Sequence, residues 1–203
     1  PLSDIFDDMV VAAQYSQLLQ QGWIVPCNVY QPPSVMDSDE LAQSPVNAYK
    51  RYANGQRAFV FCRSVEHAYS LAHEFREAGV PALTVEAQTP LNERQEALDK
   101  FARGEISVLA NVFTLGEGLD IPAASCVVLA RNCGHASTFL QICGRVLRPY
   151  AGKEHATIID LVGATLIHGL PVEDRAYSLG GTGIARTSEA ALRVCSFCGA
   201  TIL

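Results

Sequence analysis

The chain carries little positive charge for its length. Its 203 residues include 15 lysines and arginines against 21 aspartates and glutamates, so the formal net charge is −6. This balance excludes a protein that coats nucleic acid with a broadly basic surface. It leaves room for a local basic strip, because residues 131–153 contain no acidic side chain and hold Arg131, Arg145, Arg148 and Lys153.

Long apolar runs are missing as well. No stretch approaches the roughly 18 apolar residues of a membrane span, and the acidic opening Pro1–Asp8 lacks the basic leader of a signal peptide. The seven cysteines are an odd number, and five of them stand singly. Cys62, Cys126 and Cys143 lie in apolar or helical stretches, which indicates buried thiols of an intracellular protein.

Apolar strands alternate with amphipathic helices along most of the chain. Runs such as "AFVFC" (58–62) are continuously apolar, as strands buried on both faces are. The alternation predicts an α/β fold, with helices on both faces of a parallel sheet and ligands bound beyond the carboxyl ends of the strands. The expected strands are 58–62, 81–86, 105–111, 124–130 and 155–161, and the expected helices are 4–20, 38–53, 64–79, 89–104 and 136–148.

The stretch "QICGRVLRP" (141–149) places polar residues where a helix would normally carry its apolar stripe. Read as a helix, Gln141, Gly144, Arg145 and Arg148 follow the i, i+3, i+4, i+7 spacing of one face. Pro149 disfavours α geometry at Arg148, so the helix should end there, with its arginines aimed at an anion. A solvated basic face is the alternative that this stretch alone leaves open.

Two loops have the composition of phosphate-binding segments. "NVFTLGEGLDIP" (111–122) begins at the end of a strand and has glycines for close backbone approach, a threonine hydroxyl and an aspartate that could accept from a ribose. "EAQTPLNERQ" (86–95) opens a helix at Gln88 and Thr89, where backbone N–H groups favour anions. Turn glycines in the first loop, and a plain N-cap at Thr89, explain the same residues.

Together these stretches resemble the second RecA-like domain of superfamily-two helicases. "QICGRVLRP" is similar to motif VI, in the form of the branch that contains repair-type helicases, phage helicases and restriction-enzyme translocases. "TLGEGLDIP" is similar to motif V and "AFVFCRS" to motif IV. The resemblance covers about residues 56–161 and implies a RecA-like parallel sheet for them.

The resemblance also implies roles for single residues. Arg145 and Arg148 would be catalytic arginine fingers that reach ATP, bound with Mg²⁺ mainly by the first motor domain of the same protein. The other partner would be nucleic acid, with DNA favoured over RNA, and not a membrane. The implied ATP contacts are Gln141, Gly118 and Asp120, and the implied nucleic-acid contacts are Ser64, Gln88, Thr89 and Thr114.

Half of an ATPase site is missing from the sequence. It contains no G-x-x-x-x-G-K-[ST] phosphate loop and no Asp-Glu box after a strand. We therefore expect a piece of a longer ATP-dependent helicase or translocase, inactive by itself. A RecA-like module that binds nucleic acid without motor activity is the alternative, although it would not need the arginine pair. A metabolic α/β enzyme would need a nucleophile–base pair or a dinucleotide-binding loop, and neither is recognisable.

The C-terminal "RVCSFCGATIL" carries the spacing of a zinc knuckle. Cys195 and Cys198 would supply two of the four ligands of a structural zinc, and the other cysteines offer no second pair at suitable spacing. Either the other pair lies beyond Leu203 or the tail holds no metal; a redox pair would need a strand-to-helix setting. The expected organisation is an inter-domain helix and connector at 1–36, a helicase C-terminal RecA-like domain at 37–175, and a mobile tail with half of a zinc ribbon at 176–203.

Overall fold

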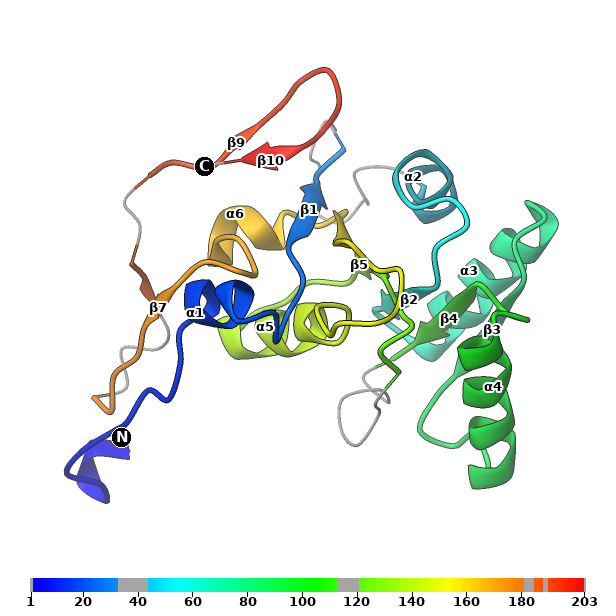
Figure 1. Ribbon diagram of the computed structural model, residues 1–203. Coiled ribbons are helices and arrows are strands. Elements are labelled where there is room, and N and C mark those ends of the chain that lie inside the picture. Colours follow the sequence, from blue (N-terminus) through cyan, green and yellow to red (C-terminus); the bar gives the residue numbers. More distant parts are fainter. Residues whose placement is uncertain (1, 33–43, 113–120, 181–184, 188–189, 203) are drawn as a thin grey trace.

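A six-stranded sheet, in which every paired neighbour runs parallel, organises the fold (Figure 1). The structure is a computed structural model and describes residues 2–32, 44–112, 121–180, 185–187 and 190–202. The strand order is β1-β6-β5-β2-β4-β3. The strands are β1 (Cys27–Tyr30), β2 (Ala58–Cys62), β3 (Ala82–Val85), β4 (Val108–Asn111), β5 (Cys126–Ala130) and β6 (Ala156–Asp160).

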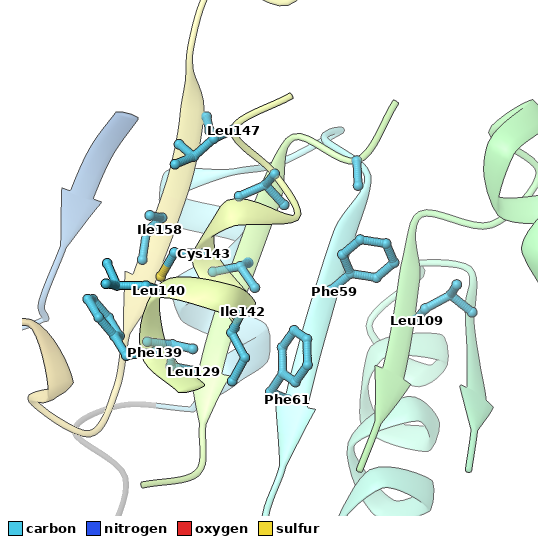
Figure 2. Close-up of a cluster of buried hydrophobic side chains, with 14 of the residues drawn as sticks. Phe59, Phe61, Leu109, Leu129, Phe139, Leu140, Ile142, Cys143, Leu147 and Ile158 are labelled. Atoms are coloured by element: carbon cyan, nitrogen blue, oxygen red, sulfur yellow. The ribbon is translucent and has the colours of Figure 1, made fainter. Parts of the chain in front are cut away.

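Helices cover both faces of this sheet, as the alternating sequence pattern predicts. α4 (Leu91–Arg103) and α5 (Ala136–Gly144) pack on one face through a core that includes Phe59, Phe61 and Phe139, and Figure 2 shows α5 lying over the strands there. α2 (Pro45–Tyr52) and α3 (Val65–Glu77) pack on the other face through a second buried core. The central strands β2, β4 and β5 are buried along their whole length, which explains their continuously apolar sequences. The predicted RecA-like α/β class is confirmed.

The remaining elements are short and lie toward the two ends of the chain. They are a 3₁₀ turn (Leu2–Asp4), α1 (Tyr15–Gln20), α6 (Ala164–His168), β7 (Arg175–Ala176), β8 (Ala185–Arg186), β9 (Arg193–Val194) and β10 (Thr201–Ile202). In the described part of the chain, no helix combines the length and the apolar character that crossing a bilayer requires.

The predicted first helix, 4–20, is wrong over most of its length. Only Tyr15–Gln20 is helical, and the residues before it expose apolar side chains such as Ile5 and Val10, which are 76% and 87% exposed. A short amphipathic helix gains its stability from packing, and this segment has no packed face. The helix begins where tertiary contacts begin: the Gln14 amide exchanges hydrogen bonds with the backbone of Arg175.

Two other helix boundaries also differ from the prediction. The helix expected at 89–104 starts at Leu91, with Pro90 rather than Thr89 at its N-cap, while Gly104 ends it in the left-handed conformation as expected. The helix expected at 136–148 ends at Gly144, so Arg148 lies beyond it. Of the helix expected at 38–53, the structure describes α2, and residues 38–43 lie outside the described residues.

Segments on both sides of the predicted RecA-like domain are attached to the sheet. β1, which falls within the predicted connector, is one of the sheet's two edge strands and pairs with β6. The β9–β10 hairpin of the predicted tail lies beside β1 (Figure 1), where Ala200 bridges to Tyr30 and the Gln31 N–H donates to the Gly199 carbonyl over 2.7 Å. The domain boundaries at 36 and 175 stay a prediction.

Candidate nucleotide and nucleic-acid interface

Four neighbouring strands deliver their carboxyl ends to one edge of the sheet. Because β5, β2, β4 and β3 are adjacent and parallel, the loops that follow Ala130, Cys62, Asn111 and Val85 emerge side by side. This is the edge at which open α/β sheets bind ligands. Three of these loops contain the residues that we expect to contact nucleic acid.

Ser64 stands at the start of α3, directly after β2. Its hydroxyl accepts a hydrogen bond from the His67 N–H at 3.1 Å, so Ser64 is the N-cap of α3. The side chain is exposed at the edge, and a hydroxyl that accepts one bond can still donate another. Capping therefore leaves Ser64 able to donate to a phosphate oxygen.

The turn Glu86–Thr89 is fixed by its own side chains. The Thr89 hydroxyl accepts from the Glu86 N–H at 2.9 Å, and the Glu86 carboxylate accepts from the Gln88 N–H at 2.8 Å. Arg94 of α4 donates to the Glu86 carbonyl. Gln88 is exposed and Thr89 is half-buried, so the turn presents both at the sheet edge without relying on Thr89 as a helix cap.

Motif VI alternates buried anchors with more open polar groups. Ile142, Cys143, Val146 and Leu147 are each at most 5% exposed, whereas Gln141 is exposed and Gly144, Arg145 and Arg148 are half-buried. Past the end of α5 the chain continues in tighter turns, with the Val146 N–H donating to the Cys143 carbonyl at 3.1 Å. The apolar side chains hold the backbone on the sheet (Figure 2). Gln141, Arg145 and Arg148 are thus more open to solvent than the apolar residues between them.

The backbone around Arg148 is fixed from two sides. The Leu147 carbonyl accepts from the N–H of Val25, in the segment leading to β1, at 2.8 Å. The Arg148 carbonyl accepts from the Lys153 ammonium at 2.9 Å. Arg145 and Arg148 each make at least one further interaction within the chain. They belong to a restrained segment, as a preorganised charge-binding group requires.

Lys153 is a residue that the motif-based interpretation does not single out. Its ammonium also donates to the carbonyls of Pro122 and Ala124, at 3.2 and 2.6 Å. Burial lowers the pKa of this amine to about 8, so the charged form still prevails at neutral pH. The signal available in the sequence is weak: a lysine four residues after Pro149, in a chain with only three lysines.

Arg63 is a second residue to which the motif-based interpretation assigns no role. It is exposed, stands directly between β2 and Ser64, and lies at the centre of the carboxyl edge. Arg131 occupies the matching position after β5 and is half-buried, which lowers the pKa of its guanidinium. A basic residue immediately after a buried strand is the pattern that could have found both.

Three of the expected contact residues lie outside the described residues. They are Thr114, Gly118 and Asp120 of the loop that resembles motif V. The chain is described again from Ile121, the second-last residue of this loop, whose carbonyl accepts from the Ala124 N–H at 3.0 Å.

The C-terminal cysteine pair lies in the turn of the β9–β10 hairpin. The Cys195 N–H donates to the Ala200 carbonyl at 2.9 Å, and the N–H groups of Cys198 and Phe197 lower the pKa of the Cys195 thiol by donating to its sulfur. Two thiols in a turn with donors aimed at one sulfur fit half of a tetrahedral zinc site. Within the described residues, no group of three or more histidine, cysteine, aspartate or glutamate side chains could hold a metal ion.

Comparison with known proteins decides the family. Residues 41–150 match the conserved pattern of the helicase conserved C-terminal domain, which is more than half of the chain. The chain belongs to this family. It is a second RecA-like domain of the superfamily-two type, as motifs IV, V and VI predict. The matched residues include α2 to α5 and the arginines of motif VI.

Relatives of this helicase C-terminal domain come from the predicted branch. A 51.5 kDa protein of a Lactococcus phage is 34% identical over 187 residues, covering 83% of this chain and 41% of the phage protein. The UvrABC system protein B of Thermosipho africanus is 31% identical over 142 residues, covering 68% of this chain and 21% of that protein. The chain therefore spans less than half the length of these relatives.

Solved structures show the same fold. The chain superposes on the Escherichia coli DEAD-box protein SrmB, solved bound to RraA, with a TM-score of 0.55 and 25% identity over 71% of this chain and 81% of that one. It also superposes on the ATP-dependent type ISP restriction-modification enzyme LlaBIII bound to DNA, with a TM-score of 0.58 and 18% identity over 74% of this chain and 13% of the enzyme. The second likeness concerns the fold alone.

Proposed function

We propose that the chain is the second motor domain of an ATP-dependent nucleic-acid helicase or translocase, and that Arg145 and Arg148 are its arginine fingers. The observation that carries the proposal is the arrangement of motif VI. Two half-buried guanidinium groups flank two buried anchors, Val146 and Leu147, on a backbone held by further hydrogen bonds.

Phosphoryl transfer is the chemistry that this arrangement suits. Charge spreads over the oxygens of the transferred phosphoryl group, and catalysis consists of positioning and electrostatic stabilisation. A planar guanidinium grips two oxygens at once, and a restrained backbone lets it do so without reorganisation. In this proposal Gln141, Gly118 and Asp120 contact the nucleotide, and the first motor domain holds ATP and Mg²⁺ because this sequence has no phosphate loop.

The nucleic-acid strand would follow the carboxyl edge of the sheet. Ser64, Gln88, Thr89 and Thr114 would touch its phosphates, and DNA is the favoured substrate. We add Arg63 to this set, because it supplies positive charge at the centre of the same edge. With a net charge of −6, the chain as a whole repels a polyanion, so contacts have to be local.

We also propose that Cys195 and Cys198 form half of a zinc site completed by another cysteine or histidine pair of the full-length protein. The turn that holds them is docked on β1, so the ion would be carried at a fixed place beside the sheet. Zinc there would be structural and would contribute stability to the hairpin.

Steady-state ATPase kinetics on the full-length protein test the motor assignment. Arg145→Ala and Arg148→Ala should each lower kcat on the order of 10²-fold or more, while KM for ATP changes little, because a finger acts on charge that develops during transfer. Lysine at either position should rescue poorly, since it is a point charge without the planar fork.

The matched control is Arg103→Ala. This exposed arginine at the end of α4 pairs with exposed Glu105 and should leave turnover unchanged. Near wild-type turnover in both motif VI variants would refute the finger assignment. A full-length protein that binds nucleic acid and turns over no ATP would instead support the alternative of a RecA-like binding module.

A further inference from the structure

Lys153 differs from the other two lysines of the chain. Lys50 is exposed on α2, and Lys100 is paired with Glu96 along α4. Lys153 is half-buried, and its ammonium donates to three backbone carbonyls within 3.2 Å. Burying a cation costs free energy unless its N–H groups are hydrogen-bonded. The hydrogen bonds to the three carbonyls offset this cost for Lys153.

The three carbonyls belong to two segments that are distant in sequence. Pro122 is the last residue of the stretch that resembles motif V and Ala124 stands two residues after it, whereas Arg148 is the second arginine of motif VI. Charge-assisted hydrogen bonds are about twice as strong as neutral ones. One ammonium group therefore ties together the backbones of the two segments that the family uses on the nucleotide.

Lys153 itself is anchored independently of these segments. Its own N–H donates to the Tyr150 carbonyl at 2.9 Å, closing a turn. The Arg57 guanidinium lies 5.6 Å from the centre of the Tyr150 ring, and Arg57 also donates to the Ala102 carbonyl at the end of α4. On the other side, β6 starts at Ala156, whose N–H donates to the Pro26 carbonyl. Because its own backbone is held in place, Lys153 can fix the positions of the three carbonyls that its ammonium binds.

We propose that Lys153 is a positioning residue for ATP hydrolysis: by tying the Arg148 backbone to the carbonyls of Pro122 and Ala124, it holds Arg148 where its side chain meets the nucleotide. This inference rests on the proposed motor function. Lys153 is placed away from the phosphates and acts through Arg148. Displacements of about 1 Å in a catalytic group can cost on the order of 10²-fold in rate, so a backbone tether at this point has kinetic consequences.

The test compares Lys153→Met with wild type in the full-length protein. Methionine keeps the length and apolar stem of the side chain and removes all three donors. We expect kcat for ATP to fall roughly 10- to 100-fold, with KM for ATP within about threefold, because the phosphate loop that binds ATP belongs to the first domain. Lys50→Met, on the exposed side of α2, is the matched control and should behave as wild type.

A double variant separates positioning from a general loss of stability. If Lys153 acts through Arg148, then Lys153→Met combined with Arg148→Ala should be no slower than Arg148→Ala alone. Additive losses would show that Lys153 acts elsewhere and overturn the inference. Should the methionine variant fail to fold in thermal melts, Lys153→Gln carries the same expectation, since it keeps an amide donor but loses the charge and reach.

The outcomes for Lys153 and for the fingers are distinguishable. Normal kcat in a folded Lys153→Met or Lys153→Gln protein, alongside impaired Arg145→Ala and Arg148→Ala proteins, would overturn the positioning role and leave the motor function standing. Normal turnover in all of these variants would refute the finger assignment, on which this inference rests.

Discussion

At the scale of single residues, the buried thiols give this fold an alkaline limit. Burial raises the pKa of Cys62 to about 12 and that of Cys133 to about 11, whereas a thiol in the unfolded chain ionises near pH ~8.5. Above that pH the unfolded state releases protons that the folded state retains. The contribution of these thiols is thus complete below about pH 8.5 and is lost as pH rises toward 11–12.

We therefore expect the melting temperature of the reduced chain to fall by several degrees between about pH 7.5 and about pH 10. Cys62→Ala should melt lower at the neutral end of this range, because it leaves a small cavity on the α3 side of the sheet, yet decline less steeply with pH. Thermal melts in reducing buffer across this pH range provide the comparison. Equal slopes for the two proteins would contradict the assigned role of Cys62.

Single-residue predictions from the sequence succeed where one local interaction decides the outcome. Ser64 caps α3 because its hydroxyl accepts from a neighbour three residues along the same helix. Thr89 does not cap α4, because Pro90 takes the N-cap and the Thr89 hydroxyl bonds backward to Glu86. The contacts of Lys153 could not be predicted, since its three acceptors come together only when residues 122–124 and 148 are folded against each other.

At the scale of elements, the β9–β10 hairpin depends on one glycine for its docking. Gly199 has φ +74°, and a Cβ there would lie 3.0 Å from the Tyr52 hydroxyl and 3.1 Å from the Gln31 carbonyl oxygen. The close approach lets the Gly199 carbonyl accept from Gln31 and brings the cysteine turn against β1. Gly79 also has a left-handed backbone, with φ +80°, but a Cβ there would meet nothing within 4 Å. It therefore resembles Gly199 in conformation and lacks its close packing.

Gly199→Ala should release the hairpin from the sheet edge. We expect amide hydrogen exchange at Gln31 and across residues 193–202 to accelerate at least about tenfold, on the basis of about 1–2 kcal/mol for the left-handed conformation plus the steric contact. Gly79→Ala should cost similar global stability and leave exchange in the hairpin unchanged. Equal exchange in both variants would show that the docking does not depend on this close approach.

The sheet could be predicted from sequence, and the element ends could not. Five of its six strands stand out as apolar runs between turn residues, and in β2, β4, β5 and β6 burial on both faces makes this signal continuous. β1 (Cys27–Tyr30) is partly exposed at the edge and has the sequence of a connector. α5 ends at Gly144 because Val146 and Leu147 have to turn into the core. This turn depends on tertiary packing, which the helical spacing of residues in the sequence does not show.

At the scale of the whole molecule, function is divided between a buried apolar frame and a thin polar edge. The strands and helices of the two cores form this frame, and the candidate contacts occupy loops and helix ends around them. Family motifs predict which loops matter, because they record residue types at fixed spacing. The direction of each side chain depends on tertiary neighbours, so the contacts that Lys153 makes emerge only from the folded structure.

The 203-residue chain by itself should bind single-stranded DNA weakly and in a strongly salt-dependent way. Its net charge is −6, and the carboxyl edge offers only a few basic groups, with exposed Arg63 at the centre. Each phosphate contact contributes about 0.7 to the slope of log K against log salt for a single strand.

Arg63→Ala should therefore weaken binding for every DNA sequence and lower the magnitude of that slope by about 0.7. Arg103→Ala, which removes an exposed ion pair of α4, should change neither the affinity nor the slope. Fluorescence titrations of a labelled oligonucleotide at several salt concentrations measure both quantities. Tight binding that ignores salt, or an unchanged slope in the Arg63 variant, would place the strand elsewhere than the carboxyl edge.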